Sequence, residues 1–283
     1  MAGLKPQKIK QVDVGNFGVR YNPDRKRTEL DNKNDLIEAL KKSRYYDAVM
    51  QMLDSPVKLW RGNKDNVKGS RISIFTPGIR KSANTNNLYT IMLSNIPSDL
   101  PPRNRSFICS TDYKKAHDYS DGPGATYMVV PLVDWSGNYI AMCPDADIWD
   151  TYRSQINHFM PGIWTLDVKG FNLAVQEAAN LSAADLRDFD KTNNALKRLT
   201  YGAIDAELGG HMRRAMHDAA WRNVRDKNCY EDLINKVFQP NYYGRLVHLL
   251  RELKPKREVW IGAPCLMIDS LVVQLMKGLK ALV

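Results

Sequence analysis

The chain has 283 residues, of which 43 % are hydrophobic and 25 % charged, a composition that excludes collagen-like, disordered and disulfide-scaffold classes. Lys and Arg number 41 against 31 Asp and Glu, and the net charge of +10 suggests a partner that carries phosphates. The longest apolar run, residues 127–133, is much shorter than the ~18 residues of a membrane helix, and no apolar stretch near the N-terminus resembles a signal peptide. We therefore expect no membrane partner.

The four cysteines are spread along the chain, without a C-x-x-C pair or a nearby pair of histidines that would complete a metal site: Cys109, Cys143, Cys229 and Cys265. This pattern favours reduced thiols in a cytoplasmic protein and no bound metal. His211 and His217 are close in sequence, but a spacing of six places them on different faces of a helix. We expect structural or solvated roles for all five histidines.

The basic excess is concentrated in one part of the chain. Residues 56–117 hold 11 Lys/Arg against 3 Asp/Glu, whereas residues 118–167 hold one Arg against seven Asp. An extended nucleic-acid-binding surface usually distributes basic and aromatic residues over most of a domain. The concentration indicates a local phosphate site instead.

The N-terminal region, residues 1–55, begins with an irregular polar arm over residues 1–33. Apolar residues at helical spacing then predict a helix over Asn34–Leu53, with Asn34 as its N-cap and Ser55-Pro56 as its stop.

Short apolar runs separated by Gly, Pro, Asn and Ser predict a mostly β segment from Val57 to Ile148. The predicted strands are VKLWRG, RISIF, LYTIML, RSFICS, TYMVVPLV and YIAMC. A turn signal at Trp135–Asn138 predicts a hairpin between Tyr127–Val133 and Tyr139–Cys143.

Residues 150–253 change to helical periodicity, with a capping-box-like start at Ser182 and Asp185. One apolar helical stripe is expected over Met212, Ala215, Met216, Ala219, Ala220 and Val224. After Pro255 two more strands, REVWIG and PCLMI, precede an amphipathic helix over Ser270–Val283. Strands before and after a helical block predict an α+β fold with a long helical insertion.

Three large polar residues lie at the ends of predicted strands: Arg61 ends VKLWRG, Ser110 ends RSFICS and Glu258 starts EVWIG. Taken one at a time, each has an ordinary alternative. Arg61 is then a solvated residue at a strand edge, Ser110 a helix N-cap and Glu258 an exposed side chain.

Together, the strings LWRG, FICSTD and REVW resemble the three motifs of ADP-ribosyltransferases of the Arg–Ser–Glu group, over roughly residues 57–149 and 254–268. Asp112–Tyr119 looks like the helix that follows the Ser motif in these enzymes, and Ser120–Ala125 like their nicotinamide-side loop. PPRNRSFICSTD and CPDADIW are most similar to bacterial or bacteriophage members.

The resemblance implies a catalytic domain over residues 56–283, with a helical insertion at about 150–253 and a split antiparallel β core of two small packed sheets. It also implies NAD as the substrate that supplies ADP-ribose, and no metal. Glu258, Arg61 and Ser110 would be catalytic. The residues expected to contact NAD are Arg61, Gly62, Ser110, Thr111 and Tyr119.

The chemistry suits these residue types. Cleavage of the bond between ribose and nicotinamide passes through an oxocarbenium-like centre, which a fixed carboxylate such as Glu258 stabilises while it holds a ribose hydroxyl. The planar guanidinium of Arg61 can orient a ribose or diphosphate oxygen better than a lysine. Ser110 would bond the ribose or fix the rotamer of Glu258.

One departure from the family pattern bears on the acceptor. Arginine-modifying members carry Glu two positions before the catalytic Glu, and here that position is Lys256. A lysine cannot accept a hydrogen bond from a guanidinium, so arginine modification is disfavoured. Lys256 would attract an acidic or nucleic-acid target, or it is a solvated lysine at a strand end. Asp112 replaces the last Ser of the Ser motif, which we expect to be tolerated.

The helical insertion contains the basic stretch HMRRAMHDAAWRNVR, which is either a target-recognition element or a solvated helix whose Met and Trp face the core. We expect a mono-ADP-ribosyltransferase that modifies a protein or nucleic acid in the cytoplasm; for a bacteriophage member, this is the cytoplasm of the bacterial host whose components it modifies. The alternative is a non-enzymatic, basic nucleic-acid-binding or virion-associated protein.

Overall fold

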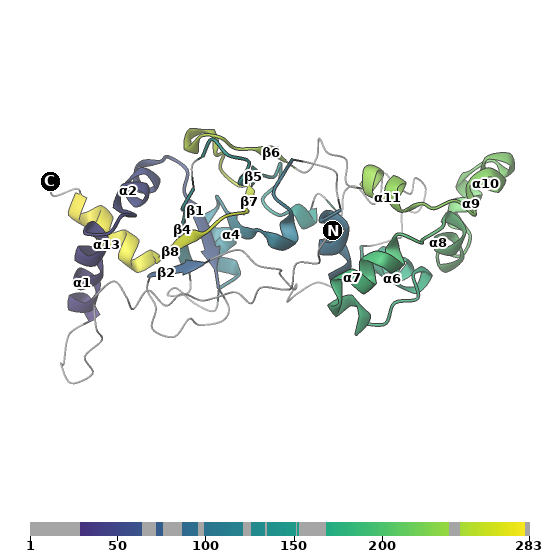
Figure 1. The fold of residues 1–283 in the computed structure, drawn as a ribbon, viewed down its shortest axis with the longest axis horizontal. Coiled ribbons are helices and arrows are strands. Elements are labelled where there is room, and N and C mark those ends of the chain that lie inside the picture. The colour runs from purple at the N-terminus through teal and green to yellow at the C-terminus, as the bar shows by residue number, and fades with distance from the viewer. Residues whose placement is uncertain are drawn as a thin grey trace. The chain divides into compact units, whose positions relative to one another are not determined.

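The computed structural model describes residues 29–63, 72–75, 87–95, 99–120, 126–133, 135–150, 152, 168–237 and 244–280. The chain divides into two compact units. Unit 1 comprises residues 1–79, 105–146 and 245–283, and unit 2 comprises residues 80–104 and 147–244. The strands of the described residues all belong to unit 1 (Figure 1). Unit 2 thus takes in residues 80–104 as well as most of the predicted insertion.

The strands of unit 1 form an antiparallel sheet, so the predicted α+β class is confirmed. Its order among the described residues is β2 (Ile72–Phe75), β8 (Cys265–Asp269), β4 (Thr126–Pro131), β1 (Leu59–Gly62), β3 (Phe107–Ser110), β7 (Glu258–Ile261), β5 (Ile140–Met142) and β6 (Arg245–Leu246).

The two halves of this sheet are joined at one point. β1 and β3 share a single residue pair, Trp60 with Ser110, whereas β1 pairs with β4 over four positions and β3 with β7 over four. Two small packed sheets were expected; hydrogen bonding instead runs from one half to the other through this single pair.

The predicted hairpin over the turn at Trp135–Asn138 is wrong. β4 pairs with β1 and β8, and β5 pairs with β6 and β7. Because each strand has only two edges, these partners leave β4 and β5 no edge through which to pair with each other. The turn residues connect the two halves of the sheet.

The helices of unit 1 pack on the sheet, with α2 and α13 against β4 and with α1 against α13 (Figure 1). The predicted helix Asn34–Leu53 is divided in two, because Ser43 donates both its N–H (3.0 Å) and its hydroxyl (2.7 Å) to the Leu40 carbonyl and ends the first helix. The terminal helix is confirmed from Ser270 to Lys280, and its last three predicted residues lie outside the described residues. The bounds are α1 (Glu29–Lys41), α2 (Tyr46–Asp54), α4 (Tyr113–Asp118), the 3-10 turn η5 (Leu250–Glu252) and α13 (Ser270–Lys280).

Unit 2 is helical in its described residues. Its elements are α3 (Asn87–Leu93), α6 (Val168–Ala178), η4 (Asp185–Arg187), α7 (Phe189–Leu196), α8 (Tyr201–Glu207), α9 (His211–Ala215), α10 (Asp218–Val224) and α11 (Tyr230–Val237); a further 3-10 turn, η2 (Arg103–Arg105), lies at its boundary with unit 1. The capping box is confirmed, since Ser182 N–H donates to the Asp185 carboxylate (2.8 Å) and Asp185 N–H to the Ser182 hydroxyl (3.2 Å).

Two predictions in unit 2 are wrong. LYTIML is helix α3, not a strand, because Leu88, Ile91 and Met92 recur at helical spacing and are all buried. The expected stripe from Met212 to Val224 is interrupted between α9 and α10, where the His217 ring accepts the Ala219 N–H (3.3 Å) and caps a new helix.

Candidate functional site

Ser110 and Glu258 lie directly opposite each other on neighbouring strands. Ser110 is the last residue of β3 and Glu258 the first of β7, and their Cα atoms are register partners. Directly opposite residues of an antiparallel pair point to the same face of the sheet. Trp60 is the partner of Ser110 on the other side, so the three side chains form a row across β1, β3 and β7.

The carboxylate of Glu258 is buried and held in place. The residue is 5 % exposed, and its Oε1 accepts a hydrogen bond from the indole N–H of Trp260 at 2.6 Å. Trp260 is itself buried and leaves β7 on the same face, two residues further along. The alternative of an exposed glutamate is therefore wrong.

Arg61 reaches from β1 across to β3. One Nη atom donates to the Ile108 carbonyl, and the guanidinium lies 4.5 Å from the centre of the Phe107 ring. Its strand lies between β4 and β3, so Arg61 is not at a sheet edge. Because it follows Trp60, Arg61 leaves β1 on the face opposite to the row of Ser110 and Glu258, and its head group lies where the two halves of the sheet meet.

Arg61 and Glu258 act electrostatically on the same buried thiol. Burial raises the pKa of Cys109 well above its usual range, the positive charge of Arg61 opposes this shift, and the negative charge of Glu258 adds to it. Cys109 immediately precedes Ser110. The two charged groups therefore lie within electrostatic reach of one atom at the end of β3.

Gly62 and Tyr119 meet where β1 passes α4. A Cβ on Gly62 would lie 2.8 Å from the Tyr119 carbonyl carbon and 2.9 Å from the Ser120 nitrogen, and it would collide with the Ala116 carbonyl oxygen. The side chain of Tyr119 is 43 % exposed at the end of α4. Of the loop predicted to lie beside nicotinamide, residues 121–125 are outside the described residues.

Thr111 ties the end of β3 to the start of β7. Its hydroxyl accepts the Arg257 N–H (2.8 Å) and donates to the Arg257 carbonyl (3.3 Å), while its own N–H donates to that carbonyl (2.9 Å). This hydroxyl thus fixes the residue next to Glu258, a role that sequence reasoning did not anticipate.

The residue that caps α4 is Asp112, which accepts the N–H groups of Lys114 (2.9 Å) and Lys115 (3.4 Å). The N-cap alternative for Ser110 is therefore wrong. Ser110 instead accepts the Asp112 N–H at 3.0 Å. Asp112, which stands where the resembled motif has its last Ser, thus caps α4 in this chain.

Lys256 is exposed and has a φ of 56°. This left-handed conformation is uncommon for a residue with a side chain. Its carbonyl accepts a hydrogen bond from the Arg257 guanidinium at 3.1 Å. The lysine therefore lies on the surface at the turn that leads directly into Glu258.

Sequence reasoning missed the aromatic residues around this row. Trp60 meets Tyr113 edge to face with ring centres 4.9 Å apart, and Tyr113 stacks on His117 at 6.0 Å. The position of Trp260 could have been predicted from the sequence, because a residue two positions after Glu258 on the same strand points to the same face of the sheet. Tyr113 and His117 had none, because their neighbour Trp60 is distant in sequence.

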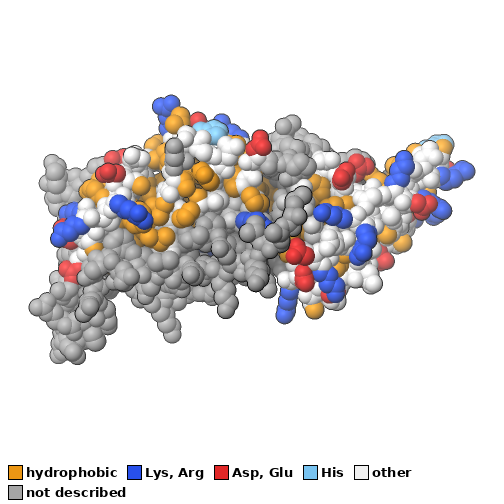
Figure 2. All heavy atoms as spheres, in the orientation of Figure 1, with side chains coloured by type: hydrophobic (Ala, Val, Ile, Leu, Met, Phe, Trp, Pro, Cys, Tyr) orange, Lys and Arg blue, Asp and Glu red, His pale blue; other side chains and the backbone are white. Residues whose placement is uncertain are grey.

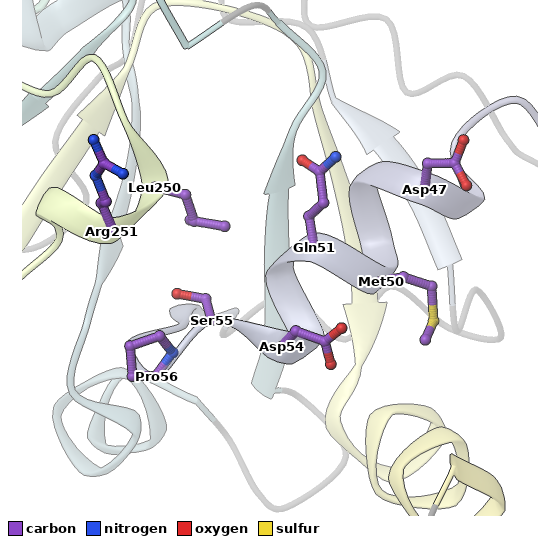
Figure 3. Close-up of a pocket in the computed structure, with 8 residues that line it drawn as sticks. All are labelled: Asp47, Met50, Gln51, Asp54, Ser55, Pro56, Leu250 and Arg251. Carbon is purple, nitrogen blue, oxygen red and sulfur yellow. The ribbon is translucent and has the colours of Figure 1, made fainter. Parts of the chain in front are cut away.

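A separate groove of about 630 Å³ lies in unit 1 (Figure 3). Residues of α2 and the following turn form one wall and residues of η5 the other: Asp47, Met50, Gln51, Asp54, Ser55, Pro56, Leu250 and Arg251 (Figure 3). None of the catalytic or NAD-binding residues predicted from the sequence lines this groove.

In the part of the chain that the structure describes, no group of three or more His, Cys, Asp or Glu side chains is placed to hold a metal ion. Among the described helices, none combines the length and apolar character needed to cross a bilayer. Comparisons with protein-family models, with curated proteins and with solved structures gave no match to this chain.

Proposed function

We propose that the protein is a mono-ADP-ribosyltransferase, which moves ADP-ribose from NAD to a macromolecular acceptor and releases nicotinamide. The observation that carries this proposal is the buried Glu258 carboxylate, directly opposite Ser110 and fixed by the Trp260 indole. The Arg61 side chain leaves β1 on the opposite face of the sheet and so adds no support of its own. The choice of this reaction comes from the resemblance of the three sequence motifs to those of ADP-ribosyltransferases.

In the proposed reaction the bond between C1′ of the ribose and the nicotinamide ring nitrogen breaks, and its electron pair leaves with neutral nicotinamide. Positive charge then develops on the ribose, where a nearby fixed carboxylate stabilises it more in the transition state than in the ground state. A nucleophilic atom of the acceptor bonds to C1′ and loses its proton to solvent. Water in place of the acceptor gives NAD hydrolysis as a side reaction.

The chain's residues take different parts in this scheme. Glu258 accepts a hydrogen bond from a ribose hydroxyl and faces the developing charge. Ser110, beside it, bonds the ribose or the carboxylate. The resemblance assigns Arg61 to a diphosphate oxygen, a role that requires NAD to reach the junction of the two half-sheets, where the Phe107 ring holds the guanidinium on the other face.

The acceptor and the compartment are part of the same proposal. An exposed Lys256 at the entry to β7 favours an acidic acceptor over an arginine side chain. Four buried cysteines without disulfides suit a reducing cytoplasm, which for a bacteriophage protein is that of the bacterial host.

The decisive experiment measures nicotinamide release from NAD by the wild-type protein and by Glu258→Gln, with cell lysate as a source of acceptor. We expect Glu258→Gln to lower the rate by about 10²–10³, the usual cost of one preorganised electrostatic contact. Label from the adenylate part of NAD should enter a protein or nucleic-acid band only with the wild type.

Glu252→Gln is the matched control. Glu252 lies in the same unit and accepts the His248 N–H at 3.1 Å, a bond that glutamine keeps. The rate of nicotinamide release by Glu252→Gln should equal that of the wild type. Nicotinamide release that is absent from the wild type, or that Glu258→Gln leaves unchanged, would refute the transferase and favour the non-enzymatic nucleic-acid-binding alternative.

A further inference from the structure

Exposed basic side chains gather on unit 2 around α8. Figure 2 shows Lys and Arg side chains standing out where α8, α9 and α10 form the surface, with fewer acidic ones among them. We call these seven residues the basic surface: Lys197, Arg198, Arg213, Arg214, Arg222, Arg225 and Lys227. All seven are exposed.

Backbone hydrogen bonds bring distant parts of the basic surface together. Gly202 N–H donates to the Arg225 carbonyl (2.6 Å) and Cys229 N–H to the Leu199 carbonyl (2.9 Å), so the segment after α7 runs beside the segment after α10. Lys197 and Arg198 on the first segment thereby join Arg225 and Lys227 on the second.

Helix α9, which follows α8 in the chain, adds two more guanidinium groups. The Asp205 carboxylate of α8 accepts the Arg213 backbone N–H at 2.9 Å and so anchors α9. The guanidinium nitrogens of Arg213 and Arg214 lie 3.8 and 3.6 Å from the position that a Cβ on Gly210 would occupy. The two like charges therefore converge on one point.

Most of the seven cations make no ion pair with a described residue. Among the described residues, only Arg225 of the seven makes an ion pair, with Asp226 at 3.0 Å. Glu207 on α8 and Asp218 at the start of α10 are exposed carboxylates nearby, and Asp205 is buried as the anchor of α9. Cations that are held close together and outnumber the neighbouring carboxylates repel one another, and an external anion relieves that repulsion.

The chemistry of the basic surface fits phosphates better than a protein or a lipid surface. Among the side chains that the structure describes between residues 197 and 228, no large hydrophobic one is exposed, since Met212 and Trp221 are buried and Met216 and Val224 are half-buried. Protein partners need aromatic or aliphatic anchors, and interfacial helices need an exposed apolar face. Five of the seven residues are arginines, whose planar donors bind phosphate oxygens two at a time.

We propose that the basic surface of unit 2 binds the phosphate backbone of a nucleic acid. Binding occurs without NAD and without Glu258, so it is separate from the proposed reaction. That this nucleic acid, or a protein bound to it, is also the acceptor of ADP-ribose rests on the proposed function.

The test is fluorescence anisotropy of a labelled DNA duplex, a labelled DNA single strand and a labelled RNA with the full-length protein, over a series of KCl concentrations and without NAD. The variant combines Arg213→Gln, Arg214→Gln and Arg222→Gln. Each lost phosphate contact lowers the slope of log Kd against log salt by about 1, so we expect a decrease of about 3 and an affinity loss of at least about tenfold.

The matched control removes three exposed cations from unit 1, as Lys42→Gln, Arg44→Gln and Lys277→Gln. It should keep the wild-type slope to within about 1. A second variant, with lysine at the three arginine positions, keeps the charge and should retain most of the affinity. Melting followed by circular dichroism verifies that each variant is folded.

The proposal fails if the wild-type protein shows no salt-dependent binding, or if the arginine variant binds as the unit 1 control does. Polyglutamate or anionic vesicles that bind as tightly as the nucleic acids would also overturn it, in favour of an acidic protein or a membrane surface. Since NAD is absent, none of these outcomes depends on whether nicotinamide release succeeds.

Discussion

Gly62 has no space for a side chain, because the backbone at the end of α4 occupies the position that a Cβ would take. None of the neighbouring atoms can swing away, since all belong to the backbone. We expect Gly62→Ala to lower the free energy of unfolding by about 1–3 kcal/mol or more, measured by urea denaturation. The glycine after Arg61 is thus explained by the packing of α4.

Gly278 provides the comparison for Gly62. It is exposed on α13, and a Cβ there would meet nothing within 4 Å. Gly278→Ala should leave stability unchanged or raise it by up to about 1 kcal/mol, because alanine favours the helix. Equal effects of the two substitutions would show that α4 does not pack on β1 in this way.

Trp260 is a positioning residue for the proposed reaction. Trp260→Phe keeps a ring in the buried site but removes the N–H that Glu258 accepts at 2.6 Å. A hydrogen bond to a charged group contributes about 1.5–3 kcal/mol, so we expect kcat for nicotinamide release to fall by about 10- to 100-fold. KM for NAD should change little, because in the proposed scheme the indole N–H contacts Glu258 and not NAD.

Trp221→Phe, in a buried position of unit 2, is the control for Trp260→Phe and should leave kcat unchanged. A loss confined to KM, or a loss in proportion to the fraction of unfolded protein, would contradict a positioning role. Parallel melting curves separate the last case from a true decrease in kcat.

At the scale of elements, the turn before α7 depends on one half-buried carboxylate, that of Asp185. Hydrogen bonds from the Lys191 side chain first, and then from Ser182, lower the pKa of Asp185 to about 2. A lowered pKa stabilises the folded state above the ordinary value of 3.8, and this contribution is lost as the pH falls through about 2.

Replacement of Lys191 by methionine should raise the pKa of Asp185 towards 3.8, because it removes the largest cause of the shift. Carboxyl NMR titration of the wild type and of Lys191→Met measures this directly. Asp190→Asn, a neighbouring change of charge, serves as the control. A titration midpoint that does not move in Lys191→Met would show that the ion pair does not form in solution.

Element types were predictable wherever local periodicity was clear. The runs around Arg61, Ser110 and Glu258 are strands as expected, because short β-favouring segments bounded by turns have few alternatives. The strand prediction for LYTIML was wrong because a short apolar run with threonine and isoleucine is compatible with either a strand or a buried helix. Only the burial of its residues at helical spacing, seen in the structure, distinguishes the two.

The pairing of strands was harder to predict from the sequence than the type of each element. The sequence suggested that Arg61, Ser110 and Glu258 belong to one site. Ser110 and Glu258 lie directly opposite each other through the register of β3 and β7, which are more than a hundred residues apart, whereas the Arg61 side chain leaves β1 on the opposite face. The turn at Trp135–Asn138 suggested a hairpin from local signals alone. Instead of pairing with each other, both flanking strands pair with strands that are distant in sequence. Each of them has two such partners in the sheet.

At the scale of the whole molecule, the cysteines are divided unequally between the units. Cys109, Cys143 and Cys265 belong to unit 1 and Cys229 to unit 2, and all four are buried. Burial raises the pKa of Cys229 to about 12 and that of Cys109 and Cys265 well above their usual range. Because the thiolate is the reactive form, the native protein should be nearly inert to thiol reagents at pH 8.

These thiols can report whether the two units unfold separately. Unit 2 is built in its described residues from helices of 5 to 11 residues, which are marginal without tertiary packing, whereas unit 1 has a sheet with a continuous apolar core. We expect Cys229 to be alkylated at a lower urea concentration than the other three, as measured by mass spectrometry of pulse-labelled peptides. One early thiol followed by three late ones would indicate two cooperative units. A single midpoint for all four would contradict this and show that the units unfold as one.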